Sequence, residues 1–340
     1  MYKMYSWGGD TGGWRGSKKY DYGSARAHYD KMAVDMPSVR TYDRRKTPDM
    51  DLTNAKGKNI QSDSEDPVIV AVDVTGSMSA WPGEIFDRLP LFYQTLAKHR
   101  PGMEIAFAAI GDATIDGYPL QITDFAKEPK DLEKKLKALG CEGGGGGHIT
   151  ESYELFGYYM MHHCKTPKAK SPFLLIYGDE AFYDNVEPKQ VKHYIGDDLE
   201  SSVNSTELWK GLMQKYELYH LHKLYGSGGE KSTDSQIIDI WRKAIGRQRV
   251  IELPFEITME DGSKMPGYQR AGDIGMGLIA KRWGEYRDFG KSLDARHDDP
   301  SVKASVHHSL RHIDADPAPV SRITAKSKTA KSKATKSLLD

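Results

Sequence analysis

The chain has 340 residues, which suffices for one large domain with appendages, and Lys plus Arg equals Asp plus Glu at 48 each. This balance excludes a strong overall attraction to nucleic acid or to membrane surfaces. Only two cysteines occur, Cys141 and Cys164, which argues against a disulfide scaffold and is consistent with a reducing compartment. Since no signal peptide and no apolar run of roughly 20 residues is found, we expect a cytoplasmic protein without a membrane partner.

The two ends of the chain differ in composition from the middle. Residues 1–65 are rich in Gly, Tyr, Asp, Lys and Arg without periodicity, which predicts a weakly ordered N-terminal arm. Residues 296–340 end in "RITAKSKTAKSKATKSLLD" and predict a basic, low-complexity, flexible tail. We expect this tail to be solvated, although its lysines could contact nucleic acid. The main domain is expected at 66–256, followed by a C-terminal helical extension at 257–295.

Strands and helices alternate through the main domain. The segment "VIVAVD" (68–73) is continuously apolar, as expected of a central parallel strand. A helix with apolar residues at helical spacing follows, and Pro90 should kink or break it. Next come a buried strand, "EIAFAAIGD" (104–112), and a shorter partner, "YPLQITDF" (118–125).

The second half of the domain continues this alternation. A polar-faced helix, "KDLEKKLKAL", runs into the glycine-rich "GCEGGGGG", and a further helix begins in "TESYELFGYYMMHH". Strands are expected in "FLLIYGDE", "YELYHLHKLYG" and "RVIELP", with the helix "IIDIWRKAIG" before the last of them and a final helix at about 273–289. This order predicts an α/β fold, with a doubly wound, mostly parallel sheet flanked by helices.

Three acidic residues, Asp73, Asp112 and Asp179, stand at the carboxyl ends of predicted strands. In doubly wound sheets these ends face the crevice in which ligands bind, and the glycine-rich loop should open on the same edge. The sequence therefore predicts a functional site at this edge.

The loop "DVTGSMS" after the first strand places Asp73, Thr75 and Ser77 at alternate positions. It lacks the Gly-x-Ser-x-Gly of a nucleophile elbow, the second acid of an aspartyl phosphatase and the Gly-Lys-Ser/Thr of a phosphate-binding loop. A serine here could cap the next helix, but a cap explains neither the other hydroxyl groups nor Asp73. Carboxylate and hydroxyl oxygens suit Mg²⁺, Mn²⁺ or Ca²⁺, so we favour a metal site.

"DVTGSMS" resembles the Asp-x-Ser/Thr-x-Ser signature of the metal-ion-dependent adhesion site (MIDAS) in von Willebrand factor type A (vWA) domains. The order of elements from about residue 67 to 254 is also similar to the Rossmann-like fold of these domains. The resemblance covers a little over half of the chain. The resemblance implies an intracellular branch of the family and a Mg²⁺ site, with Mn²⁺ or Ca²⁺ as substitutes.

The resemblance also implies further ligands. In "GGGGGHITES", Thr150 is of the expected type and is slightly favoured over His148, although Thr150 could also be a helix N-cap. In "IYGDE", Asp179 is the best match to the family's last acid, displaced by one residue. Asp112 could position a water molecule near the ion, but a strand-end acid satisfied by its own loop is the favoured interpretation.

The functional expectation that follows is a metal-dependent, protein-binding adaptor or scaffold module rather than an enzyme. An Asp or Glu side chain of a protein partner, whose identity the sequence leaves open, would complete the coordination of the ion. The alternative is a metal-dependent hydrolase such as a phosphohydrolase, for which His148 and Glu180 are the candidate base pair. A third hypothesis is an ion that only ties the loops together.

Overall fold

A computed structural model describes residues 47–78, 81–144, 149–226 and 231–314. Its centre is a six-stranded sheet in the order β12-β11-β7-β2-β3-β4. The five strands from β12 to β3 are parallel, and the edge strand β4 is antiparallel to β3. The bounds of these strands are β2 Pro67–Asp73, β3 Glu104–Ile110, β4 Leu120–Ile122, β7 Phe173–Gly178, β11 Glu217–Lys223 and β12 Val250–Leu253. The fold is therefore mixed α/β with a mostly parallel central sheet, as predicted.

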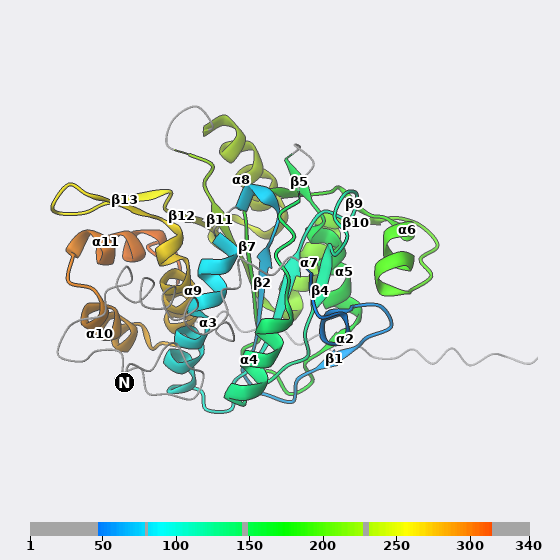
Figure 1. The fold of residues 1–340 in the computed structure, drawn as a ribbon, viewed down its shortest axis with the longest axis horizontal. Helices are drawn as coiled ribbons and strands as arrows, with labels where there is room; N and C mark the ends of the chain where they lie inside the picture. Colours follow the sequence, from blue (N-terminus) through cyan, green and yellow to red (C-terminus); the bar gives the residue numbers. More distant parts are fainter. Residues whose placement is uncertain (1–46, 79–80, 145–148, 227–230, 315–340) are drawn as a thin grey trace, which may run out of the picture.

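Helices cover both faces of this sheet (Figure 1). Alternate residues of β2 enter two different cores, since Val68 and Val70 pack into one and Ile69 and Ala71 into the other. The first core includes residues of α3 Trp81–Ala97, α4 Pro129–Ala138 and α9 Tyr268–Arg282. The second includes residues of α5 Tyr153–His162, α7 Ser205–Lys215 and α8 Lys231–Ile245.

Short elements complete the described part of the chain. They are α2 Met50–Thr53, β1 Ile60–Gln61, β5 Thr150–Glu151, β6 Cys164–Lys165, β8 Ala181–Phe182, β9 Asn185–Val186, α6 Pro188–Gln190, β10 Val203–Asn204, and the irregular turns Gly76–Met78, Val191–Ile195 and Arg247–Arg249. A hairpin, β13 Glu256–Thr258 and β14 Lys264–Pro266, precedes α9. None of the helices in the described ranges is both long enough and apolar enough to cross a membrane.

Helix α3 differs from the expectation at Pro90, because it runs from Trp81 to Ala97 without a break. Proline removes one backbone donor from a helix. The apolar face of α3, which includes Ile85, Leu89 and Phe92, is buried in the first core and holds the helix in place.

The structure has two helices, α9 and α10 Tyr286–Arg296, where the sequence predicts one helix at about 273–289. Gly284 has a φ of 78°, and the amide of Glu285 donates to the carbonyl of Ala280 at 2.7 Å. This glycine-based C-cap ends α9.

Regular elements lie beyond both expected boundaries of the domain. Strand β1 lies within the predicted arm and pairs in parallel with β6, with Ile60 opposite Cys164. Helix α11 Pro300–Ser309 lies within the predicted tail, and its Val306 is buried in the first core. Residues 296–314 therefore belong to the folded protein, because α11 supplies an apolar face that the composition of the whole segment does not reveal. Residues 1–46 and 315–340 lie outside the described residues.

Candidate metal centre

The predicted site lies where the direction of the chain across the sheet reverses. From β2 the chain moves to β3 and β4 on one side, and it later returns through β7 to β11 and β12 on the other. The carboxyl ends of β2 and β7 are therefore neighbours whose following loops diverge, the position at which open α/β sheets bind ligands. Asp73 ends β2 and Asp179 follows β7, and both side chains are fully buried.

Four of the predicted residues form one chain of hydrogen bonds. The amide and the hydroxyl of Thr75 donate to Oδ1 of Asp73 at 2.8 and 2.6 Å. The hydroxyls of Thr75 and Ser77 lie 3.2 Å apart, and Ser77 donates to Oδ1 of Asp179 at 3.0 Å. The first loop and the acid that follows β7 therefore converge, as the sequence predicts.

The glycine-rich loop packs directly on this first loop. The amide of Gly76 donates to the carbonyl of Gly144, and the amide of Gly143 donates to the carbonyl of Val74 at 3.1 Å. A Cβ at Gly76 would lie 3.0 Å from the carbonyl oxygen of Gly144, so this close approach of two backbones favours a glycine.

A lysine that the sequence analysis did not single out lies at the same place. Lys223 is the last residue of β11, and its ammonium donates to Oδ2 of Asp179 at 2.6 Å and to the carbonyl of Ser77 at 2.8 Å. The residue is 8% exposed, and its Nζ lies 4.8 Å from the centre of the Tyr225 ring. Its position at the end of a parallel strand is a signal that could have identified it.

Tyr153 is the second residue that the sequence analysis did not assign to the site. This residue begins α5, is fully buried and donates its hydroxyl to Oδ2 of Asp73. A Cβ at Gly178 would collide with this hydroxyl. Gly178, which precedes Asp179, therefore makes room for Tyr153.

Carboxyl groups crowd around this centre. Burial and the neighbouring charge of Asp179 raise the pKa of Asp73 to about 7. Burial, followed by the charges of Asp179 and Asp73, raises the pKa of Glu180 to about 8. Burial, followed by the charges of Asp73 and Asp112, raises the pKa of Glu151 to about 10. Burial is the largest cause of each shift, so an additional negative charge is unfavourable at this centre.

Two of these carboxyl groups also have an oxygen without a hydrogen bond. Glu151 and Glu180 are 3% and 4% exposed, and Oε2 of each is buried with no partner among the described residues. Buried oxygens of this kind are costly unless a donor or a cation satisfies them. The hydroxyl and carboxyl oxygens gathered here are the ligand types that a hard divalent cation such as Mg²⁺ prefers.

Thr150 and Asp112 belong to an adjacent group. Asp112 accepts from the amide and the hydroxyl of Thr114 at 2.9 and 2.8 Å and from the Tyr183 hydroxyl at 3.1 Å. Thr150 begins β5, opposite Ala181, and its side chain forms a hydrogen bond with Tyr183. Asp112 is thus satisfied largely by its own loop, the favoured interpretation. His148 lies outside the described residues.

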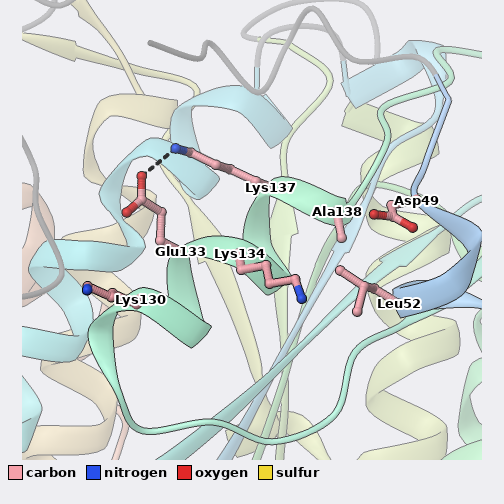
Figure 2. Close-up of a pocket in the computed structure, with 7 residues that line it drawn as sticks. All are labelled: Asp49, Leu52, Lys130, Glu133, Lys134, Lys137 and Ala138. Carbon is pink, nitrogen blue, oxygen red and sulfur yellow. Dashed lines mark ion pairs between the residues drawn. The ribbon is translucent and has the colours of Figure 1, made fainter. Parts of the chain in front are cut away.

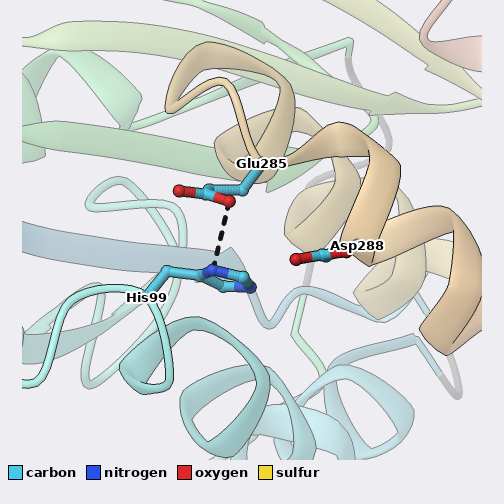
Figure 3. Close-up of side chains that lie close together, drawn as sticks. All are labelled: His99, Glu285 and Asp288. Carbon is cyan, nitrogen blue, oxygen red and sulfur yellow. Dashed lines mark ion pairs between the residues drawn. The ribbon is translucent and has the colours of Figure 1, made fainter.

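Another group of metal-binding side chains lies on the surface. His99, which follows α3, and Glu285 and Asp288, at the start of α10, place one ligand atom each within 4.8 Å of one another (Figure 3). Nδ1 of His99 lies 3.4 Å from Oε2 of Glu285, and Asp288 pairs with Lys291 at 2.7 Å. These contacts are ordinary surface ion pairs, and they connect α3 to α10.

A surface hollow of about 500 Å³ lies between α2 and α4. Figure 2 shows that the long side chains of α4 form one wall and that Lys137 is paired with Glu133. The residues that line the hollow are Asp49, Leu52, Lys130, Glu133, Lys134, Lys137 and Ala138. None of these residues belongs to the centre around Asp73.

Comparisons with known proteins give no family assignment. No family model matches the chain, and no curated protein matches it. Among solved structures, the open conformation of the pilus adhesin SpaC from Lactobacillus rhamnosus GG is 11% identical, with a TM-score of 0.43 over 66% of this chain. A second crystal structure of SpaC gives 11% identity and a TM-score of 0.39 over 58% of this chain. The chain matches only 31% and 29% of the adhesin's length, and a similarity at this level carries no argument about function.

Proposed function

We propose that this chain contains a vWA-type domain whose MIDAS-type centre holds Mg²⁺ and captures an acidic side chain of a protein partner. The sheet supports this proposal. Numbered along the chain, its six strands lie in the order 3-2-1-4-5-6, which is the order of doubly wound folds that bind ligands at the switch point. Asp73 and Asp179 flank that point.

The observation that carries the proposal is the hydrogen-bonded chain from Asp73 through Thr75 and Ser77 to Asp179. It gathers oxygen ligands from two separate strand ends in a buried place, beside carboxyl groups whose ionised form a cation would stabilise. In the proposed site Thr75, Ser77 and Thr150 would hold the ion directly, and Asp73 and Asp179 would act largely through water, as the resemblance implies. The ion supplies positive charge that neutral hydroxyl ligands leave uncompensated, so it favours an external carboxylate.

The experiment measures metal binding and carboxylate capture with the same variants. Mn²⁺ and Mg²⁺ are titrated into the native protein and Asp73→Asn by calorimetry. Immobilised short peptides that carry one Glu or Asp are then compared with matched Gln or Asn peptides. We expect the native protein to bind the metal and to retain the acidic peptides until EDTA is added, and Asp73→Asn to lose both properties.

Asp112→Asn is the matched control, because Asp112 is also a buried acid after a strand but is satisfied by Thr114 and Tyr183. Equal capture of acidic peptides by Asp73→Asn, or undiminished capture in EDTA, contradicts the proposal. Metal binding that raises the melting temperature without peptide capture supports an ion that only ties the loops together. Turnover of a phosphoester with Mn²⁺ that is lost in Asp73→Asn supports the hydrolase alternative.

A further inference from the structure

The ammonium of Lys223 occupies the space between the two loops that carry the predicted metal ligands. It donates to Oδ2 of Asp179 at 2.6 Å and to the main-chain carbonyl of Ser77 at 2.8 Å. Asp179 is fully buried and Lys223 is 8% exposed, so this ion pair is shielded from water. A buried ion pair of this kind interacts far more strongly than one on the surface.

An ammonium in this position competes with a divalent ion. Asp179 has two oxygens, of which one accepts from Ser77 and the other from Lys223. A divalent ion that interacted with Asp179 would lie a few ångströms from the ammonium of Lys223. The two positive charges would repel each other strongly, because a buried place is poorly screened. The two cations therefore exclude each other while Lys223 holds its present position.

A second acceptor for the ammonium lies beside the first. Glu180 is 4% exposed, its Oε1 accepts from the Tyr225 hydroxyl, and its Oε2 has no partner within the described ranges. The charge of Lys223 already acts on Glu180, and the ring of Tyr225 lies 4.8 Å from the ammonium. A flexible lysine side chain can therefore leave Asp179 and still find a carboxylate and an aromatic face.

We infer that Lys223 is the resident counter-cation of this centre and sets its affinity for metal. A divalent ion binds by exchange: the ammonium leaves Asp179 for Glu180, and the hydrated ion takes the place of the ammonium. This inference concerns the metal site of the proposed function, but it is independent of what the loaded site captures.

The test compares Mn²⁺ affinities of the full chain by calorimetry. Lys223→Met removes the ammonium, and Lys223→Gln removes the charge but retains a donor for the Ser77 carbonyl, in case the first variant folds poorly. Lys215→Met is the matched control, because Lys215 is also a part-buried lysine at the end of an element, and it donates to the carbonyls of Met160 and Cys164 rather than to the centre. We expect both Lys223 variants to bind Mn²⁺ at least tenfold more tightly than the native protein, and Lys215→Met to bind as the native protein does.

The role of Glu180 is tested by a double-mutant cycle. Glu180→Gln should weaken Mn²⁺ binding in the native background, because the displaced ammonium loses its acceptor, and should have little effect in Lys223→Met. An equal loss in both backgrounds overturns the transfer to Glu180. Unchanged or weaker Mn²⁺ binding by both Lys223 variants, including no binding at all, overturns the inference.

The outcome also separates this inference from the proposed function. If the native protein binds no metal and Lys223→Met does, the inference stands, and the proposed function, which needs an ion bound to the native protein, fails. If both bind metal equally and capture acidic peptides, the proposed function stands and the inference fails.

Discussion

Both oxygens of the Asp73 carboxylate are satisfied by protein hydroxyl groups. Thr75 donates to Oδ1 from the same loop, and Tyr153 donates to Oδ2 from the start of α5. These hydrogen bonds favour the ionised carboxylate, whereas burial and Asp179 oppose it and raise the pKa of Asp73 to about 7. The residue is thus held in one orientation by groups from two distant parts of the sequence.

Tyr153→Phe should destabilise the metal-free protein by about 1–3 kcal/mol, because a buried carboxylate oxygen loses its donor. Tyr159→Phe is the matched control on the same helix, since the Tyr159 hydroxyl is equally buried and has no hydrogen-bond partner in the described part of the chain. We expect this control to change the free energy of unfolding by less than about 0.5 kcal/mol. Urea unfolding in EDTA measures both, and equal losses would show that the Tyr153 hydroxyl contributes nothing specific.

At the scale of elements, α3 is packed between the sheet and the C-terminal helices. Residues of α3 and α9 share the first core, and Gly272 of α9 lets the side chain of Arg88 approach, since a Cβ there would lie 3.3 Å from Cβ of Arg88. Buried charged groups lie near this contact, since the charge of Arg270, which pairs with Asp273 of the same helix at 2.8 Å, acts on Glu84 of α3. The interface between α3 and α9 is therefore apolar and ionic at once.

Glu84 makes this interface sensitive to pH. Burial raises the pKa of Glu84 from 4.5 to about 7, although the charges of Arg88 and Arg270 oppose the shift. Because the folded-state pKa is the higher one, the stability contributed by Glu84 is fully present below about pH 4.5 and is lost as the pH rises to about 7. Glu84→Gln should reduce the loss of unfolding free energy between pH 5 and pH 8 by roughly 1–3 kcal/mol. Urea unfolding at pH 5 and pH 8 measures the difference, with the surface variant Glu133→Gln as control, and parallel pH profiles for Glu84→Gln and native protein would refute the assignment.

Helix α11 should contribute to global stability although composition places it in a tail. Leu310, just after α11, is fully buried in the first core, where a Cβ at Gly277 of α9 would lie 2.7 Å from one of its methyl groups. Leu310→Ala should therefore lower the free energy of unfolding by about 2–5 kcal/mol. His308→Ala, at an exposed position of α11, should have little effect. If this segment only touched the domain, chemical denaturation would show no loss of unfolding free energy in either variant.

At the scale of the whole molecule, the order of the strands gathers residues from distant parts of the chain at one edge of the sheet. Asp73, Asp179 and Lys223 come from β2, the loop after β7 and β11, three neighbouring strands. Parallel strands put all their carboxyl ends on the same edge, so each crossover returns the chain to this place. A ligand bound here would connect the two halves of the sheet.

Hydrogen exchange tests this connection. Saturating Mn²⁺ should slow exchange at residues 74–77 and 177–180 together, because one ion restrains both loops. The β13–β14 hairpin should exchange at the same rate with and without metal, and Asp73→Asn should show no change anywhere. Protection of only one of the two loops would contradict a shared ion.

The sheet and half of the site could be predicted because their signals are local. Continuous apolar runs identify buried parallel strands, and the spacing of Asp73, Thr75 and Ser77 in one loop identifies a set of oxygen donors. The strand-end position of Lys223 places it at this edge, but the contacts of Lys223 and Tyr153 could not be predicted in the same way. Their roles depend on side-chain direction and on the space left by Gly178, and no short motif records either.

The position of α9 has a practical consequence for anyone who works with shortened versions of this protein. A fragment of residues 66–256, the domain expected from the sequence, would keep every strand of the central sheet but would lack Ile274, Leu278 and the other buried residues of α9. The freshly uncovered surface of α3 would be apolar, and such patches promote association between copies. We expect this fragment to form soluble aggregates or inclusion bodies, whereas a version that ends at residue 314 elutes as one species in size-exclusion chromatography. Recovery of a well-behaved 66–256 fragment would show that the C-terminal helices are dispensable.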